Sequence, residues 1–193
     1  MTDVVGTVAA AAGVFAGTNV DDLIVLTVLF LASRTAGRPR PWQVWAGQYA
    51  GIGALVAIAG AAALGLTLLP DRWVGLLGLI PLALGVRGLV AAFRSADDAA
   101  TPVVASGLVS VAAVTIANGS DNIAVYTPVF RTIGLGDTLI TIAVFAVLTA
   151  VWCALGSWLG GHRHVIGLLG RWGHWLVPLV FVVIGLVILA GLL

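Results

Sequence analysis

The chain has 193 residues, of which 61% are hydrophobic and only 9% are charged. A soluble domain carries about 25% charged residues, so this composition cannot cover a water-facing surface and indicates an integral membrane protein. The net charge of +1 provides no basic face for nucleic acid, and the single cysteine excludes a disulfide framework and a cysteine-rich metal site.

Six apolar stretches are long enough to cross a bilayer, which takes about 20 residues. The N-terminus, Met1-Thr2-Asp3, lacks the positive region of a secretory signal, so we expect the first stretch to remain as a spanning helix. In chain order the predicted spans are 5–32, 42–68, 72–93, 103–128, 137–159 and 173–193. The expected fold is an all-α integral membrane protein with one transmembrane domain over 1–193.

The sequence also repeats itself. Asp21-Asp22-Leu23 recurs as Asp121-Asn122-Ile123, and the surroundings of Pro81 recur at Pro178. The matches relate the first span to the fourth and the third to the sixth, which divides the chain into repeats 1–95 and 101–193. Because each repeat has three spans, the second inserts upside down relative to the first, as in many secondary transporters. Chance similarity in such a biased composition is the alternative.

Arginine positions set the expected orientation, since cytoplasmic loops are enriched in positive residues. Loops one, three and five and their borders carry Arg34, Arg38, Arg40, Arg87, Arg94, Arg163 and Arg171, whereas loops two and four carry Arg72 and Arg131. We therefore expect the odd loops in the cytoplasm and both termini on the extracytoplasmic side.

Three aspartates fall inside predicted spans. Asp21 and Asp22 lie near the middle of the first, and Asp121 lies past the middle of the fourth. A charged Asp at the centre of a spanning helix costs roughly 2.5–3.5 kcal/mol, and such residues are read as functional by default. Spacings of three and four residues put two polar sets on helix faces: Thr18, Asp21 and Asp22 in the first span, and Asn118, Asp121 and Asn122 in the fourth.

Two such clusters of carboxylate and amide oxygens, without a basic partner in the spans, predict a site for a hard cation. Asn19 and Ser120 add oxygens if the helices are locally unwound, which Gly17 and Gly119 permit. The alternative is that protonated aspartates and amides only hold helices together.

At these residues the chain resembles the cadmium resistance transporter (CadD-type) family of the lysine-exporter superfamily. The resemblance rests on Gly-Thr-Asn-Val-Asp-Asp-Leu at 17–23 and on Asn-Gly-Ser-Asp-Asn-Ile-Ala-Val-Tyr-Thr-Pro-Val-Phe at 118–130; the proline segments at 76–82 and 173–178 are weaker. It implies export of divalent heavy-metal cations across a bacterial plasma membrane, with the metal as substrate and no resident cofactor. It also implies a metal site formed by Asn19, Asp21, Asp22, Asn118, Asp121 and Asn122.

The identity of the metal stays open. Cadmium and zinc favour sulfur and nitrogen ligands, whereas an all-oxygen site favours manganese or a similar hard ion. Softer candidates are Cys153 in the fifth span and three histidines in and after loop five, each more simply read as a packing or solvated residue: His162, His164 and His174. Coupling to proton entry is a hypothesis, because the carboxylates must be neutralised when the metal leaves. The oligomeric state is also open, a homo-oligomer included.

Three alternative functions remain for this sequence. Gly134-Leu135-Gly136-Asp137 matches the string of intramembrane aspartyl proteases, but we expect Asp137 to be an N-cap in an outer loop, far from the other aspartates, so an enzyme is disfavoured. An exporter of amino acids or other organic cations is the main alternative, since an amine pairs with the same carboxylates. A membrane scaffold without transport activity is the third.

Overall fold

The computed structural model describes residues 4–66 and 105–161, together with isolated positions within 79–90 and 179–190. Within these residues the protein is all-helical, with six α-helices and no strand. The third and sixth predicted spans lie almost wholly outside the described residues, as do Pro81, Pro178 and the three histidines.

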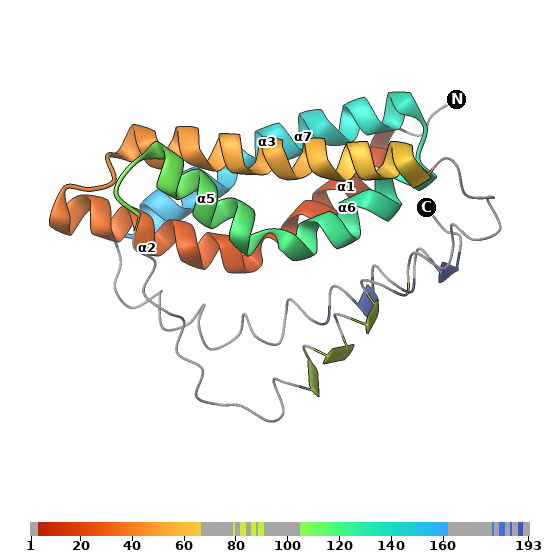
Figure 1. Cartoon of the computed structure of the whole chain (residues 1–193), viewed down its shortest axis with the longest axis horizontal. Helices are drawn as coiled ribbons and strands as arrows, with labels where there is room; N and C mark the ends of the chain where they lie inside the picture. The colour runs from red at the N-terminus through yellow and green to blue at the C-terminus, as the bar shows by residue number, and fades with distance from the viewer. Residues whose placement is uncertain are drawn as a thin grey trace.

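The first and fourth predicted spans are each a broken helix. The first consists of α1 (Val4–Thr18) and α2 (Val20–Ala36), bent by 60° at Asn19. The fourth consists of α5 (Leu108–Asn118) and α6 (Ser120–Thr132), bent by 70° at Gly119. In Figure 1 both breaks lie near the middle of the bundle. The two breaking residues are separated by the same 100 positions as the repeated acidic motif.

The second and fifth predicted spans are uninterrupted helices, α3 (Pro41–Gly65) and α7 (Leu135–Leu159), of 25 residues each. At about 1.5 Å per residue each is longer than the hydrocarbon core of about 30 Å. Both are long and apolar enough to cross a membrane, and the described residues hold up to four spans if each bent pair counts as one.

Several predicted boundaries differ from the structure. The first span was expected at 5–32, but α2 continues to Ala36. The fourth span was expected at 103–128, but it starts at Leu108 and continues through Pro128 to Thr132, whose hydroxyl bonds the carbonyls of the last turn. The fifth was expected to be capped by Asp137, but Gly134 is the N-cap and Asp137 belongs to the first helical turn.

Each long helix packs along one broken helix: α3 lies against α5 and α6, and α7 lies against α1 and α2. At one end of the bundle Arg34, near the end of α2, donates to the Ser157 carbonyl near the end of α7 (2.7 Å). At the other end Thr7, near the start of α1, donates to Asp137 near the start of α7 (3.0 Å). Because its two ends meet the matching ends of α7, the first broken helix runs in the same direction as α7. Figure 1 shows the second broken helix running the opposite way, as the predicted repeat requires of its first and fourth spans.

Glycines allow these helices to approach closely. A Cβ atom at Gly51 of α3 would lie 2.5 Å from the Thr115 side chain of α5, and one at Gly156 of α7 would lie 2.8 Å from Leu26 of α2. Each glycine has a second glycine four residues away on the same seam, Gly47 and Gly160 respectively. This small-xxx-small spacing is the usual means of bringing backbones together in a membrane, where no hydrophobic force drives helices to associate.

The outward faces of the long helices are apolar. The exposed large side chains include Ile58 and Leu64 on α3, and Leu139, Val147 and Trp158 on α7. Such a surface suits lipid rather than water.

Substitution at Gly51 tests the close approach. Gly51→Ala is expected to lower the thermal stability of the detergent-solubilised protein by about 1–3 kcal/mol, the usual cost of overpacking, because the new methyl group overlaps Thr115. Gly53→Ala is the matched control two residues away, since a Cβ atom there meets nothing within 4 Å. Equal stability of the two variants would contradict this packing.

Candidate functional site

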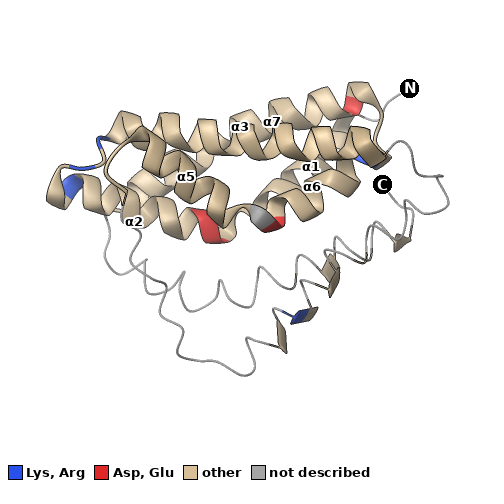
Figure 2. Ribbon diagram, in the orientation of Figure 1, with Lys and Arg blue, Asp and Glu red and all other residues tan. Residues whose placement is uncertain are grey.

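The two helix breaks meet. The Asn122 amide, in the first turn of α6, donates to Oδ1 of Asn19 at the first break (3.0 Å). Figure 2 shows acidic ribbon segments at the start of α2 and at the start of α6, midway along the bundle, whereas the basic segments at the α2–α3 connection lie at one end. Residues 100 positions apart in the sequence therefore build one polar cluster.

Side chains at the first break add to the backbone hydrogen bonding, in which the Asn19 N–H still donates to the Phe15 carbonyl (3.1 Å) and the Leu23 N–H to the Asn19 carbonyl (3.2 Å). The Thr18 hydroxyl donates to the Val14 carbonyl (3.0 Å), and the Asn19 amide donates to the Phe15 carbonyl (2.8 Å). The indole of Trp152 on α7 donates to the Asn19 carbonyl (2.7 Å). Asn and Thr side chains that compete in this way favour helix ends over helix interiors, which explains why the chain bends here.

The new helices start with the same local geometry. The backbone N–H of Asp22 donates to Oδ1 of Asp21 (2.8 Å), and that of Asn122 donates to Oδ1 of Asp121 (3.1 Å). Acidic side chains in a first turn are also stabilised by the helix dipole. In each aspartate, Asp21 and Asp121, one carboxylate oxygen thus accepts a bond from its own turn, and the other oxygen remains for further partners.

Asp22 is nearly inaccessible, with 3% of its surface exposed. Its Oδ2 atom accepts a hydrogen bond from the side-chain amide of Gln48 on α3. The Oε1 atom of Gln48 accepts from the Thr115 hydroxyl on α5 (2.8 Å). The chain Thr115–Gln48–Asp22 links three helices through fully buried side chains.

Asn19 is fully buried and is held by Tyr126 of α6. The Asn19 amide donates to the Tyr126 hydroxyl (2.9 Å), which lies 3.2 Å from the Thr18 hydroxyl. The Tyr126 ring packs against Phe145, with centroids 4.8 Å apart. Apolar and aromatic packing thus fixes the orientation of a central amide.

Two oxygens of this cluster are left without a donor. Oδ1 of Asp22 and Oδ1 of Asn122 are buried, and neither accepts a hydrogen bond from the part of the chain that the structure describes. A buried acceptor without a partner costs about 1–3 kcal/mol. Both atoms belong to side chains whose other polar atom is engaged, by Gln48 and by Asn19.

The structure brings the predicted site residues together. Asn19, Asp22 and Asn122 are buried, whereas Asp21, Asn118 and Asp121 are half-buried, and Asn118 lies beside the carboxylates of Asp21 and Asp22. Thr18 is the exception: it was expected on one face with the aspartates, but the break separates it from them and it bonds to Tyr126 instead.

The cluster is poor in the strongest metal ligands. Within residues 4–66 and 105–161, no three His, Cys, Asp or Glu side chains gather as a metal-binding group would. Any cation held here would therefore need amide or backbone oxygens beside the carboxylates. Cys153 is buried among apolar side chains such as Leu26, Phe30 and Val44.

Sequence reasoning missed three residues that shape the site: Gln48, Tyr126 and Trp152. Gln48 carried a usable signal, because an amide in the middle of an apolar span needs a partner. Tyr126 and Trp152 carried none, since aromatic residues in a span are usually packing or interfacial residues.

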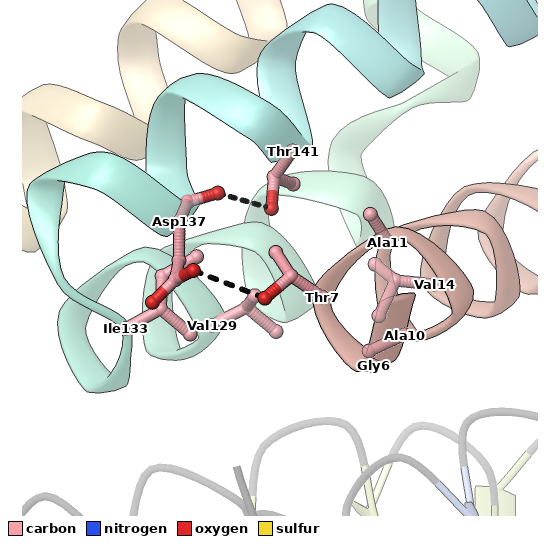
Figure 3. A pocket seen from close by; sticks show the side chains of 9 residues that line it. All are labelled: Gly6, Thr7, Ala10, Ala11, Val14, Val129, Ile133, Asp137 and Thr141. Carbon is pink, nitrogen blue, oxygen red and sulfur yellow. Dashed lines mark hydrogen bonds between the residues drawn. The ribbon is translucent and has the colours of Figure 1, made fainter. Parts of the chain in front are cut away.

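A cavity lies elsewhere in the bundle. A space of about 330 Å³ lies between the start of α1, the end of α6 and the start of α7, and none of the six candidate residues lines it. Figure 3 shows the Thr7 hydroxyl bonded to the Asp137 carboxylate and the Thr141 hydroxyl bonded to the Asp137 backbone carbonyl. We assign the site to the polar cluster, because the cavity has one carboxylate in an otherwise largely apolar lining.

Comparison with known families decides the identity of the chain. The family model described as cadmium resistance transporter matches residues 15–191, which include both helix breaks and every candidate residue. The chain belongs to the cadmium resistance transporter family. Neither curated proteins nor solved structures gave a significant match.

Membership of this family makes the protein a multi-pass membrane transporter for metal ion efflux rather than a member of an enzyme class. The substrate of a cadmium resistance transporter is a metal cation, and its surroundings are membrane lipid, in agreement with the long apolar helices.

The Tyr126 hydroxyl provides a test of the polar cluster. In this transporter Tyr126→Phe is expected to lower stability by about 0.5–1.5 kcal/mol, because the buried Asn19 amide loses an acceptor. Thermal unfolding in detergent measures the change. Tyr49→Phe is the control: it removes a hydroxyl that bonds the Ala146 carbonyl at an exposed position of α3, outside the polar cluster. A larger loss in the control would show that the network contributes little.

Proposed function

We propose that this chain exports divalent heavy-metal cations, cadmium foremost and zinc or manganese next, by secondary transport across a bacterial plasma membrane. The substrate binds between the two helix breaks, near the bilayer midplane. Its ligands are oxygens of Asn19, Asp21, Asp22, Asn118, Asp121 and Asn122. Six spans in two inverted repeats, 1–95 and 101–193, form the carrier.

The observation that carries this proposal is the pair of buried oxygens without donors, on Asp22 and Asn122. One comes from each broken helix, so a cation between them would satisfy both and join the two halves. Asp21 and Asp121, at equivalent positions, add the negative charge that a divalent ion requires. Removing these charges from water without a cation would be costly.

Broken helices support this location for a cation. Transporters built from inverted repeats bind substrates where discontinuous helices expose backbone groups, and the carbonyl ends of half-helices carry partial negative charge. Here α1 ends at Thr18 and α5 ends at Asn118, both at the cluster. Carbonyl oxygens from these ends would complete a coordination sphere that the side chains alone do not fill.

Alternating access is the transport mechanism in this proposal. At the cluster the two repeats are joined by several polar contacts, among them the bonds of Asn19 to Asn122 and to Tyr126. A rocking motion of one repeat against the other would break these contacts and open the site to either side. Proton entry during the return step would neutralise the carboxylates that the metal leaves.

Transport in proteoliposomes tests the site. With Cd²⁺, Zn²⁺ and Mn²⁺ offered in turn, Asp21→Asn and Asp121→Asn are each expected to reduce the rate at least about tenfold, because one unit of charge facing the ion is worth more than 1.4 kcal/mol. Asp137→Asn is the control, since Asp137 lies in the outlying cavity.

Uptake of lysine in place of any metal would favour the organic-cation exporter. Retention of metal transport by both Asn variants would remove the site from the proposed position.

Cysteine labelling tests the proposed orientation. With both termini outside, Leu135→Cys, at the start of α7 and 79% exposed, should react with a membrane-impermeant thiol reagent added to intact cells. Arg38→Cys, exposed in the α2–α3 connection, should react only after the membrane is opened. The buried native Cys153 provides the unlabelled background. The reverse pattern would place the termini in the cytoplasm.

A further inference from the structure

Gln48 occupies one of the two carboxylate oxygens of Asp22. Its side-chain amide donates to Oδ2, while Oδ1 of the same carboxylate has no donor among the described residues. The two oxygens of one buried carboxylate are therefore unequal. One oxygen already accepts a hydrogen bond from the protein, whose N–H dipole opposes a cation beside it, and the other is the atom that a substrate would contact.

The direction of the Gln48 amide is fixed from the far side. The Thr115 hydroxyl donates to Oε1 of Gln48, so the NH₂ group of the amide must face Asp22. The opposite orientation would set a carbonyl against a carboxylate, and the Thr115 hydroxyl would keep only the Val111 carbonyl of its own helix as an acceptor (3.1 Å). Thr115 is held in turn by the close packing of Gly51.

We infer that Gln48 is a positioning and specificity-determining residue that restricts Asp22 to monodentate coordination of the transported cation. This inference rests on the proposed function and deepens it. Large divalent ions accept both oxygens of one carboxylate, whereas small ions demand a near-ideal polyhedron of single oxygens. Because its amide bonds Oδ2, Gln48 disfavours the two-oxygen chelation that would stabilise larger ions. It also orients Oδ1 so that this single oxygen can coordinate an ion of either size.

Loss of Gln48 has two effects of opposite sign. The carboxylate loses its orientation, which weakens binding of every ion; outer contacts of this kind are typically worth about 10–100-fold in metal affinity. The freed Oδ2 then restores part of the affinity, but only for ions large enough to be chelated. The ratio of two affinities in one preparation separates these effects from general destabilisation.

The experiment is calorimetric titration of the purified full-length protein with Cd²⁺ and Zn²⁺, for the wild type, Gln48→Met and Thr115→Val. Gln48→Met keeps a long flexible side chain without a donor. It is expected to lower Zn²⁺ affinity about 10–100-fold and Cd²⁺ affinity less, so that the preference for Cd²⁺ rises at least about threefold. Thr115→Val keeps Gln48 but frees its amide to turn, and should shift the ratio the same way by less.

Two further variants complete the test. Thr115→Ser retains the hydroxyl and should restore the wild-type ratio. Thr149→Val removes a buried hydroxyl of α7 that bonds its own helix at Phe145, and should leave the ratio unchanged. If both ions lose affinity by the same factor in Gln48→Met, or if neither changes, the inference is wrong while the proposed function stands. If the folded wild type binds neither ion, the proposed function itself fails.

Discussion

The structure depends on satisfying backbone groups where two helices break inside an apolar bundle. A break frees N–H and C=O groups that water would normally bind, and in hydrocarbon each unsatisfied group costs several kcal/mol. Here polar side chains at the breaks do part of this work: Asp21 and Asp121 each accept from the next N–H. The Asn19 amide adds a second donor to the Phe15 carbonyl, which already accepts the Asn19 N–H. The residues that resemble a binding motif are thus also residues that lower the free-energy cost of the break.

This double role explains the packing around the cluster. The breaks can be supplied with partners from α3 and α7 only if those helices come close, and Gly51 and Gly156 allow them to do so. Close approach then delivers Gln48 from α3 and Trp152 from α7 to the two sides of the cluster. Even so, acceptors outnumber donors, and the surplus lies on Asp22 and Asn122. A cluster rich in acceptors and carboxylates is prepared for a cation and not for an anion.

Much of this could be predicted from the sequence, because charges in apolar segments stand out. The first, second, fourth and fifth spans followed from the length of apolar stretches, and the acidic motifs at 17–23 and 118–130 followed from polar residues at depth. The scope for unwinding at Gly119 followed from the glycine itself. The face shared by Thr18 and Asp22 did not follow, since helical spacing loses its meaning across a break. The role of Tyr126 could not be predicted, because it depends on which helix packs opposite Asn19. The extension of α6 through Pro128 was missed because no local signal places its end at Thr132.

The two halves are alike in backbone but unlike in charge, and the difference has a consequence. Asp21 and Asp121 perform the same turn-closing role, yet at the next position one helix carries Asp22 and the other carries Asn122. Two carboxylates on both sides would give four negative charges, which one divalent ion could not balance; an amide on one side reduces the number to three. In the proposed carrier a bound divalent cation balances two of the three charges, and protons that enter on the return step would replace the departed metal. Either occupant lowers the charge that crosses the low-dielectric interior, which is the physical reason for a metal and protons to use this cluster in turn.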